Sequence, residues 1–368
     1  MIRLLAVDDS ALMRRLIGEV FADEEGFDVR FARDGVEALA MLAEFSPDVI
    51  TLDVHMPRMD GLACLDRIML ERPCPVVMFS ALTADGARET LEALSLGAVD
   101  FVAKPGGAIS LKIDEFGPVL VEKVRAAFQA RLPRSHRLSE RVRARSETWV
   151  PKLRPPPGAR PAPARRTRLS PMAGAGAGRL VLVGSSTGGP PALDALLSPL
   201  PADFPWPIVV AQHMPASFTG ALAGRLDRLC ALAVSEVARP TTLEPGCVYI
   251  GRGDADLIIS RRGGDLVALP APSSTAFRWH PSVDRMVDSA LDHVEATDLV
   301  GILLTGMGND GAAAMTRVRE GGGRTIAEAE DTAVVWGMPG ELVRAGGAEA
   351  VLSLDRVAAG LLELAGRS

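Results

Sequence analysis

The sequence predicts two α/β domains, each built on a doubly wound and mainly parallel sheet, with a linker between them. Short apolar runs rich in Val, Ile and Leu recur in both halves, each ends in polar or glycine residues, and helix-like segments separate them. A chain of 368 residues, 48% of them hydrophobic, is long enough to bury two cores. We expect one domain over 1–128, a linker over 129–178 and a second domain over 179–368.

The first domain begins with two apolar runs, 2–7 and 47–52, that end in carboxylates. Asp8 and Asp9 follow the first run and Asp53 follows the second. Parallel strands bring their carboxyl ends to one sheet edge, so three carboxylates meet there. Clustered carboxylates raise one another's pKa unless a cation joins them, and an all-oxygen cluster suits Mg²⁺.

Two further runs, 76–79 and 98–103, deliver Ser80 and Lys104 to the same edge. A hydroxyl and an ammonium are the partners that an acyl phosphate on Asp53 would need.

Residues 129–178 are rich in Arg, Pro, Gly and Ala, and the second half cannot hold a stable helix or sheet. The segment 137–145 is compatible with a helix. We expect the rest to act as a linker that is semi-rigid where it is rich in proline.

In the second domain, the segment 184–189 (Gly-Ser-Ser-Thr-Gly-Gly) joins the apolar run 180–183 to a helix-like run at 190–197. A serine at such a turn is exposed beside helix N-terminal N–H groups, which is the layout of a nucleophile. A glycine-rich phosphate cradle has the same spacing, so the spacing alone does not choose between them.

A serine nucleophile needs a base, and His213 is the best candidate among five histidines. It follows the apolar run 207–212, so its ring should project at the same edge as Ser186. A dinucleotide site would favour an acidic residue there. Asp310, in the glycine-rich turn after the run 299–305, completes a Ser, His, Asp order.

The run 247–269 alternates and turns at Gly263-Gly264, which predicts a β-hairpin. His280, before Pro281, is interpreted equally well as a substrate contact or as a structural turn residue.

Four motifs of the second half together resemble the catalytic domain of the chemotaxis protein-glutamate methylesterases. The resemblance implies that Ser186 is the nucleophile, His213 the general base and Asp310 its orienting carboxylate, with Met307 N–H and Thr187 at the oxyanion and substrate side. Family members show Ala-Pro-Gly-Asp and a later His where this chain has Gly-Arg-Gly-Asp and Asp256, so a substrate role for that loop is in doubt. The motifs are Val-Gly-Ser-Ser-Thr-Gly-Gly from Val183, Ala-Gln-His-Met-Pro-Ala-Ser-Phe-Thr from Ala211, His-Pro-Ser-Val-Asp from His280 and Leu-Thr-Gly-Met-Gly-Asn-Asp-Gly from Leu304.

The first half resembles the five-stranded receiver domain of response regulators, including the Met-Pro-Arg-Met-Asp-Gly turn from Met56. The resemblance implies Asp53 as phosphoacceptor and Lys104 as a phosphoryl contact, with Ser80 and Phe101 as the switch pair. It implies a Mg²⁺ site formed by Asp8, Asp9, Asp53 and the main-chain carbonyl of His55. His55 stands where methylesterase receivers commonly have glutamate, a change expected to tune phosphoryl lifetime only.

Composition excludes several classes. A net charge of −6 argues against nucleic-acid binding, and no apolar run reaches bilayer-spanning length. We expect no signal peptide, a cytoplasmic location, no membrane insertion and a monomer. Cys64, Cys74, Cys230 and Cys247 lack metal-site spacing, so we expect no zinc.

The resemblance implies a phosphorylation-switched hydrolase that removes methyl groups from glutamyl γ-methyl esters of chemoreceptors and deamidates specific glutamines. A chemotaxis histidine kinase would supply the phosphoryl group, the receiver would inhibit until Asp53 is phosphorylated, and the catalytic domain would need no cofactor. Two alternatives stay open: a receiver fused to a nucleotide-binding oxidoreductase, and a non-enzymic output domain that signals by binding.

Overall fold

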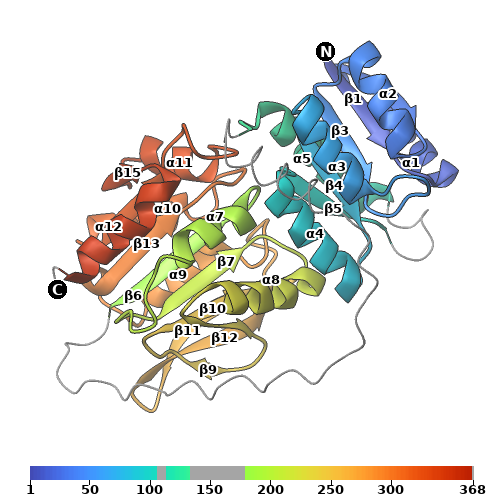
Figure 1. Ribbon diagram of the computed structural model, residues 1–368. Coiled ribbons are helices and arrows are strands. Elements are labelled where there is room, and N and C mark those ends of the chain that lie inside the picture. The colour runs from blue at the N-terminus through green and yellow to red at the C-terminus, as the bar shows by residue number, and fades with distance from the viewer. Residues whose placement is uncertain (106–112, 133–178, 367–368) are drawn as a thin grey trace.

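The computed structural model describes residues 1–105, 113–132 and 179–366 (Figure 1). The segment 137–145 and nearly all of the expected linker lie outside the described residues. The structure confirms the predicted fold class, with a five-stranded parallel sheet in the N-terminal half and a seven-stranded parallel sheet in the C-terminal half.

The N-terminal sheet has the strand order β2-β1-β3-β4-β5. Strands β3 and β4 are buried at every position, as expected where helices cover both faces of a parallel sheet. Side chains of Ser10, Asp34, Asp60 and Thr83 cap the first four helices. The elements are β1 Ile2–Val7, α1 Ala11–Ala22, β2 Phe27–Ala32, α2 Gly35–Phe45, β3 Val49–Asp53, α3 Gly61–Glu71, β4 Val76–Ser80, α4 Ala84–Leu96, β5 Asp100–Ala103 and α5 Ile113–Gln129.

The C-terminal sheet has the order β15-β14-β13-β6-β7-β10-β8, so β6 lies at its centre. Helices α7, α8 and α12 pack on one face, and α9, α10 and α11 on the other. The parallel strands are β6 Leu180–Ser185, β7 Ile208–Gln212, β8 Ala233–Val237, β10 Cys247–Gly251, β13 Leu299–Leu303, β14 Arg324–Glu328 and β15 Ala350–Leu352. The helices are α7 Gly189–Leu197, α8 Ala216–Leu229, α9 Val283–Leu291, α10 Ala312–Glu320, α11 Met338–Arg344 and α12 Leu354–Gly366, with a 3₁₀ turn at Ala296–Asp298.

The predicted hairpin is present but starts later than the alternation suggested. Its arms are β11 Ala255–Arg262 and β12 Asp265–Pro272, joined at Gly263-Gly264, where both glycines have positive φ. Strand β9 (Thr241–Thr242) pairs with β12. Residues 247–251 instead form β10 of the main sheet, where they pair with β7 on one side and β8 on the other, and Val248–Gly251 are buried.

The two domains share an apolar contact region. Helix α4 of the N-terminal domain lies against α7 and α8 (Figure 1). Phe101 of β5 contacts Phe218 of α8, and one continuous set of buried side chains runs across the boundary. Arg225 of α8 donates a hydrogen bond to the Leu91 carbonyl of α4 over 3.0 Å. The N-terminal domain is thus docked on the C-terminal one, on the side where β6 and β7 end.

No helix in the part of the chain that the structure describes has both the length and the apolarity to cross a bilayer.

Candidate active site

The first feature of the site is the tight turn after β6, which presents Ser186. The Gly189 N–H donates to the Ser186 carbonyl over 2.8 Å, and α7 begins at once. Gly188 has φ of 76°, and a Cβ on Gly189 would lie 1.9 Å from Gln212 Oε1, so both positions require glycine. Ser186 is partly exposed at this turn.

Ser185 points elsewhere. Its side chain is fully buried, and its hydroxyl donates to Gln212 Oε1 over 2.6 Å. The amide of Gln212 in turn donates to the Ser186 carbonyl over 2.9 Å. Of the two adjacent serines, only Ser186 is available to a substrate.

Strand register places His213 beside Ser186. Ser185 and Gln212 are paired residues of β6 and β7, and the His213 N–H donates to the Ser185 carbonyl over 3.0 Å. Ser186 directly follows Ser185, and His213 directly follows Gln212, so the two functional residues leave neighbouring strands at the same level. The His213 Nε2 atom lies 2.8 Å from Asp310 Oδ2. The buried Nδ1 atom has no hydrogen-bond partner among the described residues, which leaves it as the nitrogen that can accept a proton.

Asp310 is held by four donors. Besides His213, it accepts hydrogen bonds from the Ser282 hydroxyl and from the Val283 and Asp284 N–H groups at the start of α9, over 2.7–3.0 Å. Burial raises the pKa of Asp310, but the His213 hydrogen bond and the helix N–H groups outweigh it and keep the pKa below the ordinary value. The carboxylate is therefore ionised and fixed.

The glycine-rich turn that carries Asp310 also closes on the nucleophile. The Ser186 N–H donates to the Thr305 carbonyl over 3.0 Å, and a Cβ on Gly306 would come within 2.8 Å of the Ser186 Cβ. Only glycine permits this approach. Met307 follows at once, and its N–H has no acceptor among the described residues, consistent with the predicted oxyanion donor.

Thr187 and His280 have partners of their own. The buried Thr187 hydroxyl donates to Asp100 of β5, in the N-terminal domain. His280 Nδ1 lies 2.8 Å from Asp256 Oδ1, and Asp256 also accepts bonds from the Ser282 N–H and Arg285. That His280 and Thr187 contact substrate stays a prediction.

Sequence reasoning missed two buried acids that support the site. Asp256 accepts a hydrogen bond from the Ser282 N–H, and the Ser282 hydroxyl in turn donates to Asp310. Glu328, at the end of β14, accepts the Thr305 N–H over 2.8 Å beneath the glycine-rich turn. Its burial raises the pKa to about 7. For Glu328, the available signal was an acid at the end of the short run 324–328, where Ile326 and Ala327 precede it.

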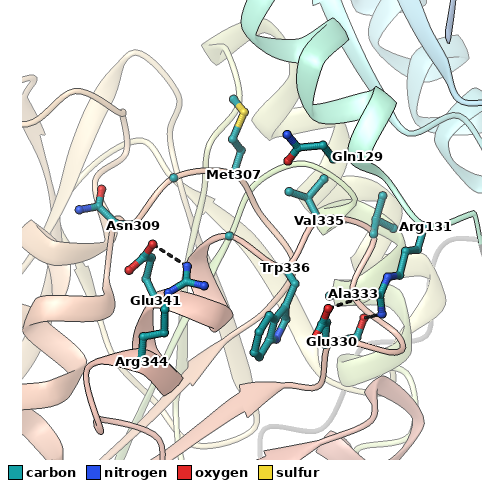
Figure 2. A pocket seen from close by; sticks show the side chains of 13 residues that line it. Gln129, Arg131, Met307, Asn309, Glu330, Ala333, Val335, Trp336, Glu341 and Arg344 are labelled. Atoms are coloured by element: carbon teal, nitrogen blue, oxygen red, sulfur yellow. Dashed lines mark hydrogen bonds and ion pairs between the residues drawn. The ribbon is translucent and has the colours of Figure 1, made fainter. Parts of the chain in front are cut away.

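A cavity of about 630 Å³ lies beside Met307 (Figure 2). Gln129, the last residue of α5, and Arg131, just after it, line one side, and Trp336 lines another. Arg131 pairs with Glu330 over 2.7 Å. The end of α5 and the residues after it therefore form part of the wall of this cavity.

The N-terminal domain holds the second constellation. Carboxylate oxygens of Asp8, Asp9 and Asp53 lie within 4.8 Å of one another. Lys104 Nζ lies 2.7 Å from Asp53 and 2.9 Å from Asp8. Burial raises the pKa of Asp53 despite Lys104. Three convergent oxygen donors fit a hard divalent cation.

The remaining predicted receiver residues lie around this cluster. The His55 N–H donates to Asp53 over 3.4 Å, while its ring faces Glu89. The Ser80 hydroxyl donates to the Gly86 carbonyl over 3.1 Å, and Phe101 is buried. The roles implied for them stay predictions.

Family models match both halves of the chain: the response regulator receiver domain over residues 4–113 and the CheB methylesterase over residues 181–361. A protein of Rhodopseudomonas palustris named protein-glutamate methylesterase/protein-glutamine glutaminase 2 is 56% identical, covering 99% of this chain and 98% of its own. A protein of Rhodospirillum rubrum named protein-glutamate methylesterase/protein-glutamine glutaminase 3 is 50% identical, and the match covers 97% of this chain and 95% of that protein. The solved catalytic domain of Thermotoga maritima CheB methylesterase is 39% identical, with a TM-score of 0.50, covering 51% of this chain and 99% of its own.

Proposed function

This chain belongs to the CheB methylesterase family and carries a receiver domain, and we propose that it hydrolyses glutamyl γ-methyl esters of chemoreceptors to glutamate and methanol. We also propose that it deamidates specific receptor glutamines, releasing ammonia, because ester and amide carbonyls share the acyl-enzyme route.

In the proposed reaction, Ser186 Oγ attacks the γ-carbonyl carbon while His213 Nδ1 takes the hydroxyl proton. Asp310 holds the imidazole through Nε2 and stabilises the imidazolium. The Met307 N–H stabilises the oxyanion of the tetrahedral intermediate. Collapse of this intermediate expels methanol or ammonia with the proton from His213. Water, deprotonated by the same nitrogen, then releases the glutamate.

One observation carries this proposal. The paired residues Ser185 and Gln212 set Ser186 and His213 side by side, and the imidazole has Asp310 on one nitrogen and an open second nitrogen. A non-enzymic output domain would not need a base oriented in this way. A nucleotide-binding domain would not need the Asp310 partner.

We further propose that the receiver inhibits the enzyme until Asp53 is phosphorylated by a histidine kinase. The contact of Thr187 with Asp100 supports this because Thr187 follows Ser186 directly, and Arg131 supports it because it lines the cavity beside Met307. Asp8, Asp9, Asp53 and the His55 carbonyl would hold Mg²⁺. When bound, this cation would neutralise charge on the phosphoryl oxygens. Lys104, which contacts Asp53 and Asp8, would pair with the phosphoryl group.

The proposal is tested by measuring methanol release from methylated receptors in membranes, with and without acetyl phosphate and Mg²⁺. We expect release that rises with the phosphodonor and is absent in Ser186→Ala. No release by the wild type under either condition would overturn the proposed function. The site of action would be the cytoplasmic side of the receptors.

A further inference from the structure

Trp279, in the segment between β12 and α9, stacks on the imidazole of His213. The two rings are nearly parallel, with an interplanar angle of 13° and 5.5 Å between centroids. Trp279 is only partly buried, so an apolar core does not explain its position. An offset stack of this kind contributes about 0.5–1.5 kcal/mol beyond the area buried.

The same indole lies over the turn that carries Asp310. A Cβ on Gly308 would come within 3.5 Å of Trp279 Nε1, so the ring edge approaches that turn closely. Trp279 therefore spans two of the three strand ends that build the site. The indole packs on the face of the His213 imidazole, whereas Asp310 contacts the edge of the ring at Nε2.

Arg278 connects this indole to the receiver. Its guanidinium carbon lies 4.8 Å from the centroid of the Trp279 ring, within cation–π range. The same guanidinium pairs with Glu122 of receiver helix α5 over 2.7 Å. Arg278 is 70% exposed, so this ion pair is weak. Its importance lies in its position, because it is made only while the receiver is docked.

We propose that Trp279 is a positioning residue for His213, and that Arg278 makes the stack responsive to receiver docking through Glu122. The inference rests on the proposed function of His213 as the base. Asp310 fixes one edge of the imidazole and Trp279 fixes its plane, so that the ring keeps the orientation in which Nδ1 would take the Ser186 proton. The indole face also favours the imidazolium that forms when His213 takes the serine proton.

Kinetics give the first test, using the full chain activated with beryllofluoride and Mg²⁺. We expect Trp279→Ala to lower kcat about three- to tenfold with a smaller change in KM, the range that the loss of one aromatic stack produces. Trp279→Phe keeps an aromatic face and should restore most of kcat. A kcat for Trp279→Ala equal to that of the wild type would overturn the inference.

Fluorescence gives a second test that does not depend on turnover. An imidazolium quenches the emission of an indole stacked on it. The Trp279 emission, taken as wild type minus Trp279→Phe, should therefore fall as the solution is acidified and His213 takes up a proton. The fall should vanish in His213→Asn. The other charged groups facing the stack are Asp310, Arg278 and Glu122. A fall that persists without His213 would contradict the stacking.

The link to the receiver is tested with Glu122→Gln in the unphosphorylated chain. We expect the Trp279 emission to shift toward that of the activated protein. Glu19→Gln is the matched control, since Glu19 is another receiver acid that pairs with an arginine, Arg15, on α1, and lies away from the docked face. Equal emission spectra for Glu122→Gln and Glu19→Gln would show that receiver docking does not affect the Trp279 stack. An inactive wild type would overturn the proposed function instead, while the emission would still report the stack.

Discussion

Phe101 of receiver strand β5 lies directly against Phe218 of helix α8, with 4.4 Å between the ring centroids. Both side chains are buried at the domain boundary. A change in the Phe101 rotamer on phosphorylation would therefore disturb the packing against α8. This contact gives the proposed switch a direct physical route from Asp53 to the catalytic domain.

A fragment that begins at Arg179 should hydrolyse ester faster than the unphosphorylated full chain. It lacks the receiver that we propose to be inhibitory, and the solved Thermotoga maritima catalytic domain shows that a domain 39% identical to it folds alone. Asp53→Asn should hold the full chain at its low resting rate. Methanol release from the three proteins, with and without acetyl phosphate and Mg²⁺, checks this. If the fragment hydrolyses ester no faster than the unphosphorylated full chain, the proposed inhibition by the docked receiver is wrong.

Thr187→Val should raise the resting activity of the full chain by roughly tenfold, because it removes a buried hydrogen bond to the charged Asp100. The same substitution in the fragment from Arg179 distinguishes a role of the Thr187 hydroxyl in receiver docking from a role in substrate binding. Unchanged activity of the fragment would mean that the hydroxyl acts in docking alone. A loss of activity would mean that it also contacts the substrate, as the resemblance implied.

Ser186→Ala should lower kcat by several orders of magnitude while leaving the fold intact. Ser185→Ala is the matched control. It leaves Gln212 Oε1 without its donor, so we expect about 1–3 kcal/mol lower stability with kcat within a few-fold. Methanol release and thermal unfolding of both variants give the answer. Activity of Ser186→Ala within tenfold of the wild type would disprove the nucleophile assignment.

His213→Ala should be as damaging as Ser186→Ala, and the double variant no worse than either, because the two residues act as one unit. Asp310→Asn should be severe but less complete, since the imidazole loses its ionised partner. Rate measurements on the single and double variants check this. If His280→Ala proved more damaging than His213→Ala, the choice of base would be incorrect.

Glu328 should make the catalytic domain less stable as the pH rises. Its pKa is about 7 when folded against an ordinary value of 4.5, so the folded state binds more protons between these limits. The stabilisation is complete below about pH 4.5 and is lost by about pH 7, and the maximum change is roughly 3 kcal/mol. Denaturant unfolding of the fragment from Arg179 and its Glu328→Gln variant, compared across this range, measures it. A difference that does not vary with pH would contradict the prediction.

The sequence was sufficient for the parts of the molecule that local patterns determine. Strands ended where apolar runs met polar residues, so it was predictable that Ser186, His213 and Asp310 meet at one sheet edge. Buried strands and glycine turns leave strong local signals. The start of the hairpin was not predictable, because residues 247–251 run on into the alternating segment after them and no local signal shows that they pair with β7 and β8 of the main sheet.

Contacts between distant segments could not be predicted in this way. Asp256 reaches Ser282 across 26 residues, and Phe101 meets Phe218 across the domain boundary. Neither pairing has a periodic signature, because each depends on how complete elements pack. Trp279 is the clearest case, since no pattern in a loop indicates that its ring will lie on an imidazole.

The docked interface also acts in the opposite direction. Coupling free energies are reciprocal, so if phosphorylation of Asp53 weakens docking by some factor, docking weakens phosphorylation at equilibrium by the same factor. The catalytic domain is then an allosteric ligand of its own receiver. The strength of contacts such as Asp100 with Thr187 sets how much phosphodonor the cell must supply before the enzyme responds.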